Sequence, residues 1–141
     1  MKVVDIIFPD LSTPCQLPVA GCRISAGFPS PADDFIENSL DLNLELIKNP
    51  AATFFVRVSG SSMKDAGIFD GDILIVDRSL RAANRKIIIA ILNGELLVKR
   101  LCIRNDQFIL MPENRNFTPI YLTDESDFNI WGVVTNVIHK V

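Results

Sequence analysis

The amino-acid sequence predicts a mostly β protein: an antiparallel β domain preceded by a flexible N-terminal arm and one or two short helices. Two observations support this fold class. From Ala52 onward the chain consists of short runs rich in β-branched and aromatic residues, separated by turn signals such as Pro112–Asn116. Asn93-Gly94 between two apolar runs is a strong signal for a two-residue hairpin. Ahead of Ala52, prolines and short amphipathic stretches replace this pattern.

Length and composition indicate one folded domain. The chain has 141 residues, of which 48% are hydrophobic and 22% charged, enough to form a core. The formal net charge of -3 argues against a protein that coats nucleic acid, which needs basic surface to neutralise phosphates. No apolar run is long enough to span a membrane, and the first apolar stretch contains Asp5 and ends at Pro9, unlike a signal peptide. We therefore expect a cytoplasmic protein without membrane attachment.

The cysteines give no sign of a disulfide framework or a zinc site. Cys15, Cys22 and Cys102 are an odd number and show no C-x-x-C spacing. We expect reduced thiols, and neither a metal nor a cofactor.

Two segments with different sequence patterns precede the β-rich part. Residues 1–26 have several prolines and little periodicity, which is typical of an arm. A helix is predicted after it, because Ser30 can cap a helix and Pro31 suits its first position. A second helical turn or two should end before Pro50. The apolar positions of these two helical segments are Phe35, Ile36, Leu40, Leu44, Leu46 and Ile47.

The stretch "VSGSSMKDAGIFDGDILIVD" contains adjacent serines, Ser61 and Ser62, between two β-like runs. Small polar residues collect in turns for backbone reasons alone, so a plain turn is one interpretation. A serine nucleophile would need a base to accept its proton. His139 lies in a C-terminal strand pattern, so a Ser-His-Asp triad is not expected.

Lysine can act as the base if it is neutral, and burial in apolar surroundings favours the neutral form. Lys99 lies in "GELLVKRLCI", where strand alternation places it on the same face as Leu97 and Leu101. Arg100, on the opposite face, is the charge expected to face solvent. The alternative is a Lys99 at the solvent edge of its strand, which is usual for lysine.

The segment "ISAGFPSP" is predicted to be extended, because Phe28 and Ser30 each precede a proline. It contains two small residues in succession, Ala26 and Gly27. A protease cleft can bind such a segment by strand addition. The alternative is a hinge between arm and domain.

Together, these pieces resemble the LexA/UmuD family of self-cleaving proteins, the S24 type of serine–lysine peptidases, from about Ser25 to the C-terminus. The matching motifs are Ala26-Gly27-Phe28-Pro29, "SGSSMKDAGIFDGDILIVD", "NGELLVKRL" and "IWGVV". The UmuD type is the most similar, through "GFPSPADDFIENSLDLN" and "NPAATFFVRVSGSSM". Two positions depart from it: Ala26 stands where UmuD-type chains often have cysteine, and "ANRK" replaces a usual Gly-Asp.

The resemblance implies a role for each site residue. Ser62, just before the methionine, would be the nucleophile, and Lys99 the general base. The backbone amides of Ser61 and Ser62 would form the oxyanion hole. The Ala26–Gly27 bond would be cut, so that residues 1–26 form an arm removed by self-cleavage. Residues 27–141 would then be a β-rich peptidase domain with the LexA/UmuD-like fold.

The resemblance also implies partners and a biological role. UmuD-type proteins are bacterial homodimers that a RecA filament on single-stranded DNA triggers after DNA damage. The trimmed fragment then joins a Y-family, UmuC-like polymerase subunit in error-prone translesion synthesis, as part of the SOS response. Direct operator binding is not expected, because a proline-rich stretch as short as residues 1–26 cannot form a helix-turn-helix domain.

Two other functions are also compatible with the sequence. A non-catalytic β-domain binding module would use Lys99 structurally and the arm as a dimerisation strap. A peptidase acting on other proteins would share the serine–lysine chemistry. The basic stretch "RSLRAANRK", which contains Arg78, Arg81, Arg85 and Lys86, is either a solvated loop or a partner contact.

Overall fold

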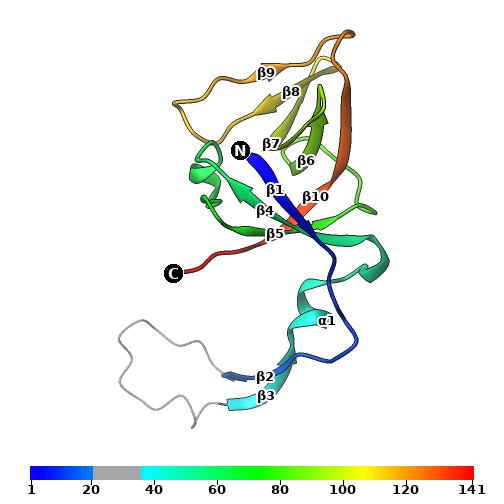
Figure 1. Cartoon of the computed structure of the whole chain (residues 1–141), viewed down its shortest axis with the longest axis vertical. Coiled ribbons are helices and arrows are strands. Elements are labelled where there is room, and N and C mark those ends of the chain that lie inside the picture. The colour runs from blue at the N-terminus through cyan, green and yellow to red at the C-terminus, as the bar shows by residue number, and fades with distance from the viewer. Residues whose placement is uncertain (21–35) are drawn as a thin grey trace. The chain divides into compact units, whose positions relative to one another are not determined.

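The computed structural model describes residues 1–20 and 36–141 (Figure 1). The chain divides into two compact units. Met1–Pro9 and Asn49–Val141 form the first, which we call the β unit, and Asp10–Lys48 form the second. Each unit is described by itself below.

An eight-stranded antiparallel sheet makes up the β unit, in the order β1-β4-β5-β10-β6-β7-β8-β9. The strands are β1 (Lys2–Ile7), β4 (Thr53–Ser59), β5 (Ile73–Asp77), β6 (Ile87–Leu92), β7 (Glu95–Arg104), β8 (Gln107–Met111), β9 (Ile120–Tyr121) and β10 (Phe128–Ile138). Two short 3-10 helices, η2 (Pro50–Ala52) and η3 (Lys64–Ala66), lie just before and after β4. The predicted mostly β, antiparallel fold class is confirmed.

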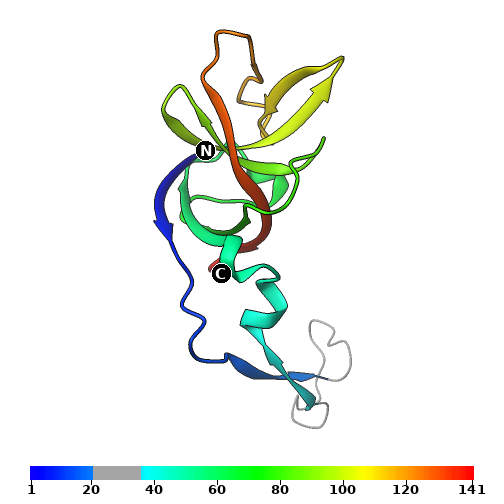
Figure 2. The ribbon, with the colours of Figure 1, turned by 90° about the vertical axis from the view of Figure 1, so that its right-hand side faces the viewer.

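The sheet closes on itself through β1. This strand pairs with β4 along its length and with β7 through Lys2 and Leu97, so that β1, β4, β5, β10, β6 and β7 form a ring (Figure 1). Figure 2 shows β10, coloured orange to red, running the length of the β unit. Its first part pairs with β6 and its second part with β5, which joins the two halves of the ring.

Apolar side chains fill the β unit in two clusters. One is formed mainly by β4, β5 and the buried turn after β4, and includes Met1 and Met63. The other is formed by β6, β7 and β8, and includes Leu97 and Leu101. Both therefore contact β7, the strand that carries Lys99.

Two tight hairpins order β6, β7 and β8. Asn93 and Gly94 both have positive φ between β6 and β7, as the sequence predicts for this dipeptide. Asn105 and Asp106, between β7 and β8, also both have positive φ. Because both residues of each turn lie in the left-handed region, the turns match the right-handed twist of the strands. This fixes the register of β7.

In the second unit, β2 (Gln16–Ala20) pairs antiparallel with β3 (Ile36–Asp41), and α1 (Leu42–Leu46) follows directly. The side chain of Asp41 caps α1 by accepting a hydrogen bond from the Asn43 amide. The second predicted helical segment is therefore present as α1. The first prediction is wrong for Ile36–Asp41, which is a strand, because pairing with β2 overrides its weak helical periodicity.

The expectation of an irregular arm over residues 1–26 also differs from the structure where that stretch is described. β1 is a regular strand of the β unit, since its backbone pairs with β4 and β7, and β2 pairs with β3. The proposed domain boundary at Ala26–Gly27 lies outside the described residues.

Within residues 1–20 and 36–141, no helix has the length and apolar character that crossing a membrane requires. Cys15 and Cys102 are free thiols, and Cys22 lies outside the described part of the chain.

Candidate active site

The structure brings Ser62 and Lys99 into direct contact. The Lys99 Nζ donates a hydrogen bond to the Ser62 Oγ over 2.8 Å, across 37 positions of sequence. Ser62 is 1% exposed and Lys99 6% exposed. A serine hydroxyl thus meets a primary amine in surroundings from which water is largely excluded.

The turn after β4 positions Ser62. Gly60 turns the chain with a φ of +97°, a conformation that a side chain would strain, and its amide donates to the Asp70 carboxylate. Met63, fully buried in the core cluster of β4 and β5, anchors the other side of the serine. The hydroxyl is therefore held between a fixed turn and the core.

The middle of β7 positions Lys99. Its backbone pairs with Ile88 of β6, and the buried side chains of Leu97 and Leu101 lie on the same face of the strand. Arg100, on the other face, is partly exposed and pairs with Glu113. Lys99 is therefore buried and does not lie at the solvent edge of its strand, which was the alternative.

Burial lowers the pKa of Lys99 below 10.5, because desolvation penalises its charged form. A hydrogen bond with the α-amino group of Met1 acts in the opposite direction and limits this lowering. The result is an amine closer to neutrality than an ordinary lysine, which is the property a general base requires.

Met1 also contacts the serine, a contact that no motif in the sequence predicts. Its α-amino nitrogen donates to the Ser62 Oγ over 2.5 Å, and its carbonyl accepts from the Val98 amide over 3.0 Å. Burial lowers the pKa of this amino group from 8.0 to about 5, with the neighbouring Lys99 and Lys2 adding to the effect. The beginning of β1 therefore occupies the site beside the hydroxyl.

The loop between β8 and β9 contacts the serine turn from another direction. The Glu113 amide donates to the Ser62 carbonyl over 2.8 Å, and the Asn114 Nδ2 donates to the Ser61 carbonyl over 2.9 Å. In the sequence, Pro112–Asn116 indicated only a turn. An asparagine in a predicted turn is the sole signal for Asn114, and turns contain many such residues.

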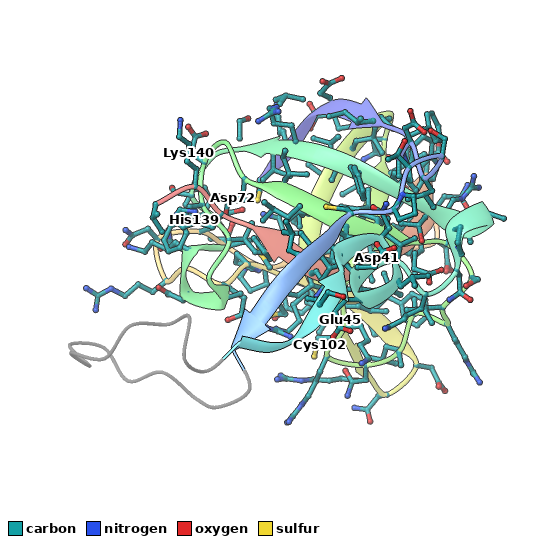
Figure 3. The ribbon with its side chains drawn as sticks, turned by 90° about the horizontal axis from the view of Figure 1, so that it is seen from below. Asp41, Glu45, Asp72, Cys102, His139 and Lys140 are labelled. Carbon is teal, nitrogen blue, oxygen red and sulfur yellow. The ribbon has the colours of Figure 1, made fainter. Side chains whose placement is uncertain are left out.

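His139 lies at a different place in the β unit. Its Nδ1 is 2.6 Å from the Oδ1 of buried Asp72, just beyond the end of β10 (Figure 3). The other oxygen of Asp72 accepts from the Phe69 amide. His139 thus has a carboxylate partner of its own, consistent with the expectation that it is not the base for Ser62.

The remaining predicted site residues are the scissile pair. Ala26 and Gly27 lie outside the described residues, so the structure gives no geometry for the bond to be cut. Among the residues that are described, no group of three or more His, Cys, Asp or Glu side chains is arranged to hold a metal ion. Chemically, the arrangement offers a hydroxyl nucleophile and a desolvated amine that can accept its proton.

The basic stretch from Arg78 to Lys86 is a loop between β5 and β6, with its arginine and lysine residues exposed. The Arg78 guanidinium lies 5.8 Å from the ring centre of Trp131, and the Arg85 carbonyl accepts from Arg100. The exposed basic side chains fit a solvated loop, and they equally leave this surface open to a partner.

A known protein family and several known proteins are similar to most of this chain. The family described as peptidase S24-like matches residues 18–135, a range that contains both Ser62 and Lys99. Protein MucA of Salmonella typhimurium is 49% identical over 115 residues, which cover 81% of this chain and 78% of MucA. Protein ImpA of Shigella flexneri is 44% identical over 124 residues, 87% of this chain and 83% of ImpA.

Protein SamA of Salmonella typhimurium strain LT2 is 45% identical over 118 residues, 84% of this chain and 81% of SamA. The similarity therefore extends over most of each chain and not only over the serine motif. The protein is a UmuD-like member of the LexA/UmuD family of S24-like peptidases.

Proposed function

We propose that this protein is a self-cleaving serine peptidase in which Ser62 is the nucleophile and Lys99 the general base. The observation that carries the proposal is the buried 2.8 Å contact between the Ser62 Oγ and the Lys99 Nζ. Family membership supports it, because serine peptidase chemistry needs such a pair. The substrate is the Ala26–Gly27 bond of this chain or of a second copy.

The reaction begins when neutral Lys99 accepts the proton of the Ser62 hydroxyl. The Ser62 Oγ attacks the Ala26 carbonyl, and the backbone amides of Ser61 and Ser62 stabilise the oxyanion. Protonated Lys99 then donates to the departing Gly27 amine, and water hydrolyses the acyl-enzyme. Tethering supplies a high effective concentration, so the chain needs no tight substrate binding.

The proposal includes a step that frees the site. The α-amino group of Met1 contacts the same hydroxyl that the substrate must reach, so the beginning of β1 has to move before Ala26 enters. Movement of residues 1–26 would therefore control the rate of cleavage. Entry of an apolar segment would also desolvate Lys99 further and favour its neutral form.

In the cell, we propose the role that the UmuD resemblance implies. A homodimer in the bacterial cytoplasm would be triggered by a RecA filament on single-stranded DNA. Cleavage would remove residues 1–26, and residues 27–141 would serve as the accessory subunit of an error-prone, UmuC-like Y-family polymerase in SOS mutagenesis. No sequence-specific DNA binding of its own is involved.

The direct test is incubation of the purified chain at about pH 10, near the ordinary lysine pKa, followed by mass spectrometry. We expect a fragment that begins at Gly27, and none from a Ser62→Ala variant. An unchanged chain, or equal cleavage of the variant, would leave the binding-module function as the better account. Cleavage of added proteins without self-cleavage would favour the peptidase that acts on other proteins.

A further inference from the structure

The loop Pro112–Asn116 holds the two peptide groups that flank the nucleophile. Asn114 Nδ2 donates to the Ser61 carbonyl over 2.9 Å. The Lys64 amide donates to the same carbonyl over 3.3 Å, and the Glu113 amide donates to the Ser62 carbonyl over 2.8 Å. The carbonyls on both sides of Ser62 are therefore fixed by hydrogen bonds.

These contacts also set the direction of the amide groups. A trans peptide is planar, so its N–H points opposite to its carbonyl, and the described chain contains no cis peptide. The peptide that joins Ser61 to Ser62 carries the Ser61 carbonyl and the Ser62 N–H. When Asn114 holds the carbonyl on one side, the N–H is directed to the other side.

No acceptor within residues 1–20 and 36–141 takes a hydrogen bond from the Ser62 N–H. A free, directed backbone amide beside a nucleophile is the kind of group that stabilises an oxyanion, provided that its position is fixed in advance. The contact with Asn114 supplies that fixation.

Asn114 is itself immobilised. It is 5% exposed, its Oδ1 accepts from the Asn116 amide over 3.0 Å, and its carbonyl accepts from the Phe117 amide over 3.1 Å. Because the Oδ1 is used as an acceptor, the Nδ2 must be the group that faces Ser61. Two of its hydrogen bonds thus hold it within its own loop, and the third, from Nδ2, reaches the serine turn, so this buried polar side chain is fully paired.

We propose that Asn114 is a positioning residue for self-cleavage: by holding the Ser61 carbonyl, it orients the Ser62 amide toward the oxyanion and keeps the Ser62 hydroxyl beside Lys99. This inference rests on the proposed function of Ser62 and Lys99. It adds a residue from the loop between β8 and β9 to a site otherwise formed by the serine turn and β7.

The test compares Asn114→Ala with wild type and with Asn116→Ala, a matched control that removes an exposed amide from the same loop but keeps the backbone N–H. First-order self-cleavage is followed from neutral to alkaline pH. We expect Asn114→Ala to slow cleavage about 10- to 100-fold at every pH, since loss of an oxyanion donor itself costs about 100- to 1,000-fold. The pH of half-maximal rate should stay unchanged, and Asn116→Ala should cleave like wild type.

A folded Asn114→Ala that cleaves at the wild-type rate would overturn the inference. A shift in the pH of half-maximal rate with an unchanged maximal rate would also overturn it, because Asn114 would then act on Lys99. A wild-type chain that never cleaves would instead refute the proposed function.

If Asn114→Ala fails to fold, Asn114→Asp serves as the second variant. It keeps the size of the side chain and an acceptor for the Asn116 amide, but it cannot donate to Ser61 when ionised. Its crystal structure reports on orientation independently of activity. A turned Ser61–Ser62 peptide supports the inference, and an unmoved one contradicts it.

Discussion

The α-amino nitrogen of Met1 lies 2.5 Å from the Ser62 Oγ, on the hydroxyl that also accepts a hydrogen bond from Lys99. Two amines thus share one hydroxyl, and they cannot both be in the positively charged form there without repulsion. The pairing of β1 with β7 brings Met1 to this place, so the strand that closes the ring is also the strand that covers the serine.

The adjacent serines should respond differently to mutation. Ser62→Ala should reduce self-cleavage to background, because it removes the nucleophile. Ser61→Ala should cleave within about threefold of wild type, because the backbone amide and carbonyl remain. Rates of fragment formation at alkaline pH, measured on gels and by mass spectrometry, check both. Loss of cleavage in Ser61→Ala with an intact fold would assign a role to its side chain.

Self-cleavage should speed up as the pH rises and level off at a pH below 10.5. The reason is that Lys99 must be neutral to act, and burial lowers its pKa below that of an ordinary lysine. The measurement is the first-order rate constant across the alkaline range. A rate that still rises steeply above 10.5 would show that Lys99 keeps an ordinary pKa, in conflict with its burial.

Lys99→Met should abolish cleavage and leave the free energy of unfolding unchanged or increased at pH 7. Because the folded-state pKa of Lys99 is lowered, the unfolded chain binds a proton more tightly, and burial of the amine opposes folding below pH 10.5. Methionine fills a similar volume without that cost. Urea unfolding checks this, with exposed Lys86→Met as the matched control. A strong destabilisation by Lys99→Met alone would point to a structural role for the lysine.

Docking of the first residue should weaken as the pH falls from 8 to about 5. The free α-amino group binds a proton below about pH 8, whereas the docked group does so only near pH 5. Hydrogen exchange reports this, because the Val98 amide donates to the Met1 carbonyl. The protection factor of the Val98 amide should drop across this range. The protection factor of the Leu101 amide, which donates to the Lys86 carbonyl, should stay constant. Parallel changes at both amides would contradict the prediction.

Gly132→Ala should destabilise the β unit by about 1–3 kcal/mol, the usual cost of overpacking a core position. A Cβ at this position of β10 would lie 2.7 Å from the Val76 Cγ1 and 3.1 Å from the Asp77 carbonyl oxygen. Thermal or urea unfolding measures the change. Asn129→Ala, at an exposed position of the same strand, should change stability by less than about 0.5 kcal/mol. A neutral Gly132→Ala would mean that β10 and β5 can separate locally.

Local rules in the sequence predict part of the site, whereas the pairing of Ser62 with Lys99 across 37 positions was expected only from the family resemblance. Alternation along a strand predicts which face Lys99 occupies, and Asn93-Gly94 predicts the hairpin that fixes the register of β7. The contacts of Met1 with Ser62 and of Asn114 with Ser61 were not predicted. They span 61 and 53 positions of sequence, and no local pattern encodes contacts over such distances. Ile36–Asp41 was predicted helical because its pairing with β2 is likewise non-local.

Closure of the ring by β1 has a practical consequence for expressing the protein. Residues fused ahead of Met1 would have to continue from a nitrogen that lies against the Ser62 Oγ, in a place that is almost closed to solvent. A purification tag at that end would therefore separate the start of β1 from β7 and alter the reactivity of the Ser62 hydroxyl. Val141 is fully exposed beyond the end of β10, so a tag belongs at the carboxyl end.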